Sequence, residues 1–327
     1  MKPTIRAAAV ITAGLAFTGL TTASATAVEM PCNTARLIVP WGAGGESDIL
    51  MRIVLEGYNR LGGKPELQVV TITGQGGVRG TREAKDAKPD GCTVFSTFEH
   101  LLAGNLTGRL DFSWDAFEPI ARITTTVSLM GAGPNAPFDN YKEMKAWANA
   151  NPGKLLAAGT LGSTSHFSLL QIQDALGIED MKVVSYDGTA DRMKAILADT
   201  VHFGQVSEST GAEHARAGRI KLLGINYHKR SEVVPDVPTA AEQGFPVNIT
   251  SNRGWVLPKG TSPEIVQYYA DMMEKAANDQ KVIDAIERVG SFVEFERGED
   301  YVNWWKTTHE DWTRIAKKLG VYRAATN

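Results

Sequence analysis

The chain has 327 residues, with 34 lysine and arginine residues against 37 aspartate and glutamate residues and a formal net charge of −3 at pH 7. This balance, together with the lack of any basic block or basic-aromatic alternation, argues against a nucleic-acid-binding protein. A site for an anion would have to rely on local dipoles and one or two placed cations, because the bulk charge is unfavourable.

The first 27 residues have the pattern of an export signal. Lys2 and Arg6 precede an apolar run over residues 7–20, and Ala25-Thr26-Ala27 matches a small-residue cleavage site. The apolar run is short for a bilayer span, so an N-terminal membrane anchor is the weaker alternative. We expect removal of residues 1–27 as a signal peptide and a periplasmic mature chain of about 300 residues, large enough for two domains.

Apolar β-rich runs then alternate with helix-like runs along the chain. Strands are expected at 36–40, 67–72, 92–97, 119–124, 127–132, 155–159, 182–186, 201–206, 221–226, 253–257 and 291–295. Helices are expected at 47–61, 78–87, 98–104, 140–150, 165–176, 189–198, 208–217, 239–243, 263–278, 280–289 and 298–319. This alternation predicts an α/β protein whose sheets are mostly parallel and flanked by helices.

Two breaks in the pattern suggest where domains meet. They lie near 131–134 and 250–254, and three strand-helix units stand between them. We expect domain 1 to comprise residues 28–129 plus 252–327 and domain 2 to comprise 130–251, so that the chain crosses between them twice. This layout is typical of a hinged two-lobe binding protein with its ligand in the cleft.

The two cysteines stand at the starts of predicted strands. Cys32 precedes the first strand and Cys92 opens the third, so their starts lie within disulfide reach if these strands are neighbours. Export favours a disulfide, and two free thiols are the alternative. No metal site is expected, because there is no CxxC motif and the histidines are scattered.

The stretch from Leu37 to Arg52, LIVPWGAGGESDILMR, reads as a strand, a glycine turn and a helix start. Such a loop presents main-chain N–H groups at the positive end of a helix, which suits an anion. A dinucleotide fingerprint does not fit, because Ser47 stands where the third glycine of GxGxxG belongs, and no cofactor is expected. Ordinary turn chemistry is the alternative interpretation.

A second loop of this kind, GTLGSTSH, runs from Gly159 to His166 and precedes a helix-like run. Ser163 with His166 suggests a secreted serine hydrolase, but the chain has no GxSxG motif and nothing in the pattern supplies an acid to orient the histidine. Helix capping by Ser163 or Ser165 is the structural alternative to ligand binding.

Two further segments have similar features. Residues 186–191, YDGTAD, again follow a strand and open a helix. Arg253 lies at the second domain crossing, where it could pair with a carboxylate in bidentate fashion. An ordinary surface arginine is the alternative.

Taken in order, these segments resemble the periplasmic solute receptors of tripartite tricarboxylate transporters, also called the Bug family. LIVPWGAGGESDILMRIV is similar to the opening signature of the family, and AKPDGCTVF is similar to a conserved strand start. GTLGSTSHFSLLQIQDALGI, VVSYDGTADRMKAIL and AGRIKLLGINYHKRSEVVPDVPTAAEQGFP resemble three later blocks. The resemblance covers almost the whole mature chain.

The resemblance implies a two-domain Venus-flytrap receptor without catalysis. It implies a small carboxylate ligand and delivery to membrane transporter subunits, or in some relatives to a membrane sensor. We expect a monomer. The positions that the resemblance places at the ligand are Trp41, Gly44, Gly45, Glu46 and Ser47 on one lobe, and Gly162, Ser163, Thr164, Ser165, Tyr186, Gly188 and Thr189 on the other.

Three residues depart from the family pattern. Glu46 is acidic where a small or neutral residue is usual, so it would repel an anion or meet an amine or hydroxyl of the ligand. Gln205 stands near a position that is commonly apolar, and Arg253 replaces a neutral residue. We interpret Arg253 as a partner for a second carboxylate on the ligand.

Overall fold

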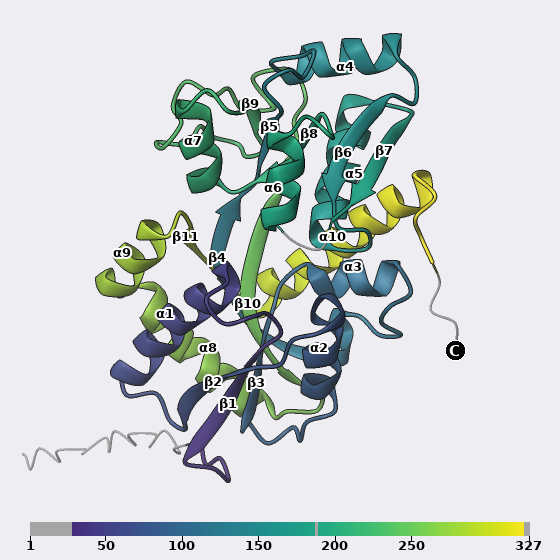
Figure 1. The fold of residues 1–327 in the computed structure, drawn as a ribbon. Coiled ribbons are helices and arrows are strands. Elements are labelled where there is room, and N and C mark those ends of the chain that lie inside the picture. Colours follow the sequence, from purple (N-terminus) through teal and green to yellow (C-terminus); the bar gives the residue numbers. More distant parts are fainter. Residues whose placement is uncertain (1–27, 187–188, 324–327) are drawn as a thin grey trace, which may run out of the picture.

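Two β-sheets covered by helices organise the chain in the computed structural model, which describes residues 28–186 and 189–323 (Figure 1). The predicted signal segment, residues 1–27, lies outside the described part. The first sheet has the order β11-β4-β10-β3-β1-β2, and the second has the order β7-β6-β8-β5-β9. The predicted α/β architecture is therefore present.

The strands of the first sheet are β1 (Thr34–Val39), β2 (Glu66–Thr71), β3 (Thr93–Thr97), β4 (Phe117–Val127), β10 (Thr250–Pro258) and β11 (Phe292–Arg297). Those of the second are β5 (Leu129–Ala132), β6 (Leu155–Gly159), β7 (Met181–Ser185), β8 (Phe203–Val206) and β9 (Lys221–Ile225). Central strand β3, TVFST, is buried along its whole length, although three of its five residues carry hydroxyl groups.

The helices are α1 (Glu46–Arg60), α2 (Val78–Lys85), α3 (His100–Leu106), α4 (Tyr141–Ala150), α5 (Thr164–Leu176), α6 (Thr189–Leu197), α7 (Glu208–Arg216), α8 (Pro263–Ala277), α9 (Gln280–Arg288) and α10 (Gly298–Lys318), with short 3₁₀ helices η1 (Gln75–Gly77) and η2 (Trp114–Ala116). Local chemistry fixes several of their starts. Ser262 caps α8 with Pro263 in its first turn, and the Asp279 carboxylate accepts two N–H bonds at the start of α9.

The sheets are mixed, which corrects the expectation that they are mostly parallel. Strand β1 pairs in parallel with β2 and β3, but β10 is antiparallel to both β3 and β4, and β11 is antiparallel to β4. In the second sheet β5 is antiparallel to both of its neighbours. Strands β4 and β10 run antiparallel because the chain passes from β4 into the second sheet and returns from it into β10.

These connecting strands, β4 and β10, form a long antiparallel ribbon in the middle of the molecule (Figure 1). Ser128 links β4 to β5, and its N–H donates to the carbonyl of Ile249, just before β10 (3.1 Å). The carbonyl of Ser128 in turn accepts from the N–H of Asn226 after β9 (3.0 Å). Both connections between the sheets therefore lie side by side. The predicted boundaries at residues 130 and 251 remain a proposal.

The helix expected at 239–243 is wrong, because this segment forms only a turn. Pro238 precedes it, and Gly244 follows with φ of +93°, so the run is too short to propagate a helix. The side chain of Glu242 accepts from the N–H of Thr239 (2.7 Å), and that of Gln243 accepts from the N–H of Tyr141 (2.7 Å). The turn therefore anchors the start of α4.

Two links tie distant parts of the chain together. Cys32 and Cys92 are joined by a disulfide with Cα atoms 6.1 Å apart, before β1 and β3 respectively. Trp312 of α10 stacks on Phe167 of α5, with ring centroids 4.5 Å apart and planes 7° apart. Helix α10 therefore contacts the second domain although its own strand neighbours belong to the first.

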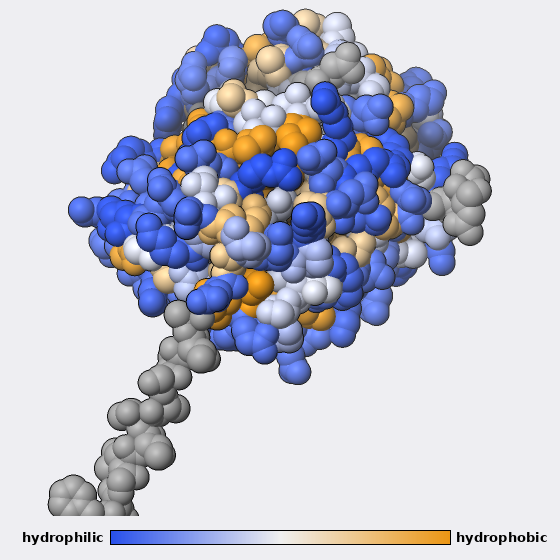
Figure 2. Space-filling model, turned by 90° about the horizontal axis from the view of Figure 1, so that it is seen from below, coloured by the Kyte–Doolittle hydropathy of each residue, from blue (hydrophilic) through white to orange (hydrophobic). Residues whose placement is uncertain are grey.

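None of the helices in the described ranges is long and apolar enough to cross a membrane. Seen from below, the surface is mostly hydrophilic with separate hydrophobic areas (Figure 2). Those areas are interrupted by hydrophilic residues, so this face shows no broad apolar patch.

Candidate functional site

The first predicted loop lies between β1 and α1, and backbone N–H groups at its end are, within the described residues, free to bind a ligand. Gly44 has φ of +78°, which a glycine adopts without strain, and its N–H donates to Oδ2 of Asp48 (2.9 Å). Burial raises the pKa of Asp48, but the bonds from Arg52 and Gly44 outweigh it and hold the pKa below its usual value. The N–H groups of residues 46–48 donate to no other group in the described chain. The start of α1 therefore offers free donors at a positive helix end.

An aromatic wall lies beside this loop. The ring of Trp41 is 5.5 Å from those of both Phe98 and His100, measured between centroids. Gly77 has φ of +91°, which favours glycine, and a methyl group there would lie tightly against the rings of Trp41 (3.2 Å) and His100 (3.1 Å). Burial, assisted by the charge of Arg109, lowers the pKa of His100 to about 3, so this ring is neutral.

Arg253 is buried and engaged, so it is not an ordinary surface arginine. Its Nε donates to Oγ of Ser47 (2.9 Å), its Nη1 to Oγ1 of Thr126 (2.8 Å) and its Nη2 to Oε2 of Glu46 (3.1 Å). The side chain is only 4% exposed, and the guanidinium lies 5.5 Å from the Phe98 ring centroid. Glu46 and Arg253, which both depart from the family pattern, therefore form an ion pair with each other. This pair attaches the first loop to β10.

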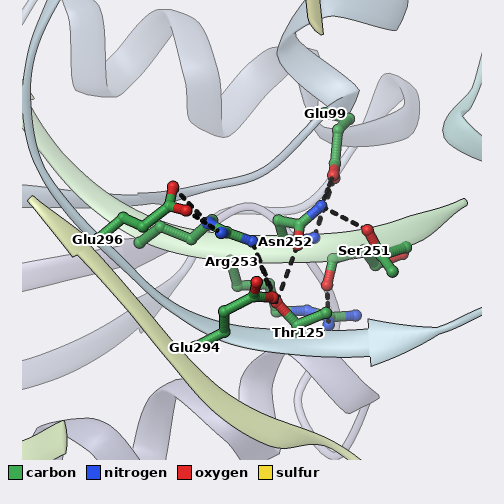
Figure 3. A network of polar contacts seen from close by, with 9 residues as sticks. Glu99, Thr125, Ser251, Asn252, Arg253, Glu294 and Glu296 are labelled. Atoms are coloured by element: carbon green, nitrogen blue, oxygen red, sulfur yellow. Dashed lines mark hydrogen bonds and ion pairs between the residues drawn. The ribbon is translucent and has the colours of Figure 1, made fainter. Parts of the chain in front are cut away.

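A polar network continues from Arg253 along the connecting ribbon (Figure 3). Glu99 accepts from the side-chain amide of Asn252 (2.6 Å), and the side-chain oxygen of Asn252 accepts from Nη1 of Arg122 (2.7 Å). Arg122 pairs in turn with Glu294 and Glu296 of β11. Arg122 and Arg253 are buried on the connecting strands β4 and β10, whereas Glu294 and Glu296 are partly exposed.

The second predicted loop, between β6 and α5, is held by its own hydroxyl groups. Oγ of Ser163 donates to the carbonyl of Thr160 (2.7 Å) and contacts Oγ of Ser165 (2.9 Å), which accepts from the N–H of Thr160 (3.1 Å). Ser163 is the N-cap residue of α5 by position, but its side chain accepts no helix N–H. The N–H groups of residues 164–166 have no partner within the described ranges, so this helix start also offers free donors.

Ser163 and His166 do not form a catalytic pair. Nδ1 of His166 accepts the N–H of Gly162 (3.1 Å), whereas the Ser163 hydroxyl is directed to a carbonyl. Burial, assisted by the charge of Arg109, lowers the pKa of His166 to about 4. The geometry that a serine nucleophile needs, a base within hydrogen-bond reach, is not formed here.

The side chain of Arg109 lies close both to η1 and to the loop between β6 and α5. A methyl group at Gly76 of η1 would lie 2.9 Å from its Nη1, and one at Gly162 would lie 3.3 Å from its Nε. The only hydrogen bond of its side chain among the described residues is a long one from Nε to Oγ1 of Thr107 (3.4 Å), and no described carboxylate pairs with the guanidinium. Burial lowers the pKa of Arg109, because the charged form loses solvation that no described carboxylate replaces.

Arg192 is a second cation beside the same loop. Its Nη1 donates to Oγ1 of Thr160 (3.0 Å) and its Nη2 to Oγ1 of Thr189 (3.1 Å), while Nε is buried without a partner among the described residues. Oγ1 of Thr160 donates onward to the carbonyl of Tyr186 (2.6 Å). Burial lowers the pKa of Arg192, and no described carboxylate lies within ion-pair distance.

The structure gives fewer contacts for the remaining predicted positions. Gly188 lies outside the described residues. Gln205 is half-buried on β8 opposite Met130 of β5, and its side chain makes no hydrogen bond to the described residues. Arg109 and Arg192 were not predicted, although the acidic balance called for placed cations. The signal for Arg192 was its position three residues after Thr189, in the first turn of a predicted helix.

Comparison with known proteins decides the family. Residues 51–321 match the family model of the tripartite tricarboxylate transporter family receptor, TctC. The chain belongs to the TctC receptor family. It is 29% identical to a UPF0065 protein of Cupriavidus necator over 92% of each chain, and 27% identical to protein BugT of Bordetella pertussis over 86% of each. The predicted family is thereby confirmed.

Several solved structures share this fold. A TctC solute binding protein from Polaromonas has a TM-score of 0.74 at 25% identity, over 88% of this chain and 98% of that one. MatC from Rhodopseudomonas palustris, solved with bound malate, has a TM-score of 0.72 at 24% identity, over 88% and 99%. An R. palustris protein solved with adipate has a TM-score of 0.74 at 21% identity, over 90% and 99%. The predicted two-domain binding-protein fold is confirmed.

Proposed function

We propose that this TctC receptor binds a small carboxylate between its two domains in the periplasm and delivers it to a tripartite tricarboxylate-type membrane transporter. The observation that carries the proposal is the pair of half-buried cations, Arg109 and Arg192, beside the loop between β6 and α5. Uncompensated buried charge is costly, and a ligand carboxylate would compensate it. The malate and adipate found in two structural neighbours are ligands of the same chemical class.

Two arginine side chains lie beside one short loop. Arg109 lies close to Gly162, and Arg192 donates to Thr160. Because Thr160 and Gly162 are two positions apart in the chain, their Cα atoms are at most about 7.6 Å apart. The free N–H groups of residues 164–166 point from the same loop. A carboxylate at the start of α5 would therefore meet both the helix dipole and a guanidinium, and a second carboxylate could meet the other cation.

The first domain contributes Trp41, Gly44, Gly45, Glu46 and Ser47 in this proposal. We infer that Arg253 acts on the ligand through this loop, because its side chain is buried and three of its N–H donors are used by Glu46, Ser47 and Thr126.

A thermal-shift panel of mono-, di- and tricarboxylates with neutral sugars as the comparison tests the proposal. A ligand at one hundred times its Kd should add about 2.7 kcal/mol to the free energy of unfolding. Stabilisation by sugars but by no carboxylate would contradict the proposal.

Variants then test the two cations. Replacing Arg109 or Arg192 by methionine should weaken the carboxylate about tenfold or more, because each change removes charge-assisted hydrogen bonds. Arg219→Met, at an exposed arginine paired with Glu213, is the matched control and should leave the affinity unchanged. Full affinity in both Arg109→Met and Arg192→Met would refute their role.

A further inference from the structure

A cavity with a lining different from that of the proposed carboxylate site lies beside the ribbon that connects the sheets. Its volume is about 230 Å³, and its walls come from both domains. One face of α10 supplies Trp304, Thr307, Thr308, Asp311 and Trp312, which follow helical spacing. The other lining residues are Glu99, Gln171, Asn248, Thr250 and Asn252.

The charge of this lining is negative. Two carboxylates, those of Glu99 and Asp311, line the cavity together with amides and hydroxyls, and no lysine or arginine is among its described lining residues. The Asp311 carboxylate is shared with Arg314 (2.7 Å), so Glu99 provides the main unshared charge. Glu99 is only 3% exposed, and the described bonds to its carboxylate all come from Asn252.

A buried amide also has unused acceptor capacity in this cavity. Gln171 is 8% exposed and donates through Nε2 to the carbonyl of Phe167 (3.3 Å). Its side-chain oxygen accepts no hydrogen bond from the part of the chain that the structure describes. This oxygen and the Glu99 carboxylate therefore leave acceptor capacity open to a donor in the cavity.

We propose that this cavity binds a small organic ammonium ion, with its N–H groups donating to Glu99 and Gln171 and its carbon atoms against the rings of Trp304 and Trp312. An ammonium group supplies up to three donors and no acceptor, which matches the lining. The rings of Trp304 and Trp312 supply apolar surface against which the carbon atoms of such a ligand can pack. The volume admits a ligand of several non-hydrogen atoms rather than a drug-sized molecule.

Calorimetry with ethanolammonium chloride and the mature chain, in amine-free phosphate buffer at pH 8 and constant ionic strength, tests this site, because burial raises the pKa of Glu99 to about 7 and the carboxylate is charged at pH 8. 1-Propanol is the neutral probe of the same shape. We expect saturable binding of ethanolammonium and none of 1-propanol. Glu99→Gln should weaken ethanolammonium at least about tenfold, because it removes the charge and keeps the shape.

Two further variants keep the test decisive. Gln171→Leu should weaken the probe at least about threefold through loss of its acceptor. Glu310→Gln removes the same charge one residue from Asp311 but outside the cavity lining, and it should leave the affinity within twofold of the wild type. The proposal fails if ethanolammonium and 1-propanol bind alike or not at all. It also fails if Glu99→Gln and Gln171→Leu both retain wild-type affinity.

Discussion

Glu99 should make the stability of this receptor depend on pH. Burial raises the pKa of its carboxyl to about 7 from a usual value of 4.5, against the opposing effect of the bonds from Asn252 and the charge of Arg253. Between these values the folded chain holds a proton on Glu99 that the unfolded chain has lost. The contribution of this group is therefore fully present below pH 4.5 and is lost as the pH rises through about 7.

The magnitude follows from the size of the shift. A pKa change of about 2.5, at 1.36 kcal/mol per unit, corresponds to a loss of about 3 kcal/mol of stability between pH 4.5 and pH 8. Glu99→Gln cannot ionise, so it should escape this loss. Relative to the wild type, the variant should gain about 3 kcal/mol over this range.

Urea unfolding of both proteins at pH 4.5, 6, 7 and 8 measures this difference. Other titrating groups contribute equally to both chains and cancel. Glu310→Gln, which neutralises an exposed carboxylate on α10, is the control and should follow the wild type. A difference between wild type and Glu99→Gln that stays constant within about 0.5 kcal/mol across the range would refute the reasoning.

Three further changes have defined outcomes. Serine at both Cys32 and Cys92 should cost about 4 kcal/mol in urea unfolding, since the disulfide closes a loop of 60 residues, and the denatured, unreduced wild type should show no free thiol on titration. Arg253→Met should lower the free energy of unfolding by about 3 kcal/mol. If Arg253 acts through the loop that it holds, the variant should bind mono- and dicarboxylates with equally reduced affinity. A loss of affinity confined to dicarboxylates would show direct contact. Gly254→Ala should cost about 2 kcal/mol by the same measurement, because a methyl group there would lie 2.4 Å from the carbonyl oxygen of Ala121; an unchanged unfolding midpoint would contradict this.

Local patterns in the sequence were enough to locate the elements. Each predicted strand overlaps an observed one, because apolar β-branched runs such as LIV before Pro40 can bury both faces only inside a sheet. The segment at 239–243 failed for a local reason as well, since Pro238 and Gly244 limit it to one turn. Strand direction was mispredicted because it depends on where the chain crosses between sheets, which no local pattern records.

The site was harder to predict, because its chemistry depends on which charges are already paired. Arg253 was selected from its position at the domain crossing, yet its partner Glu46 stands 207 residues earlier. Arg109 was not predicted because it lies close to Gly162 only in the folded chain, and no sequence pattern indicates that contact. A sequence shows where cations lie along the chain, but only the fold shows which of them lack a carboxylate.

The stack of Trp312 on Phe167 gives this receptor a built-in optical reporter. The two rings belong to α10 and α5, so any rotation of the second domain relative to the first must slide or separate them. Indole emission responds to the polarity and contacts of its surroundings, so domain movement on ligand capture should be visible without an attached dye. The same contact limits how far the domains can part, because separating the rings would expose buried aromatic surface to water.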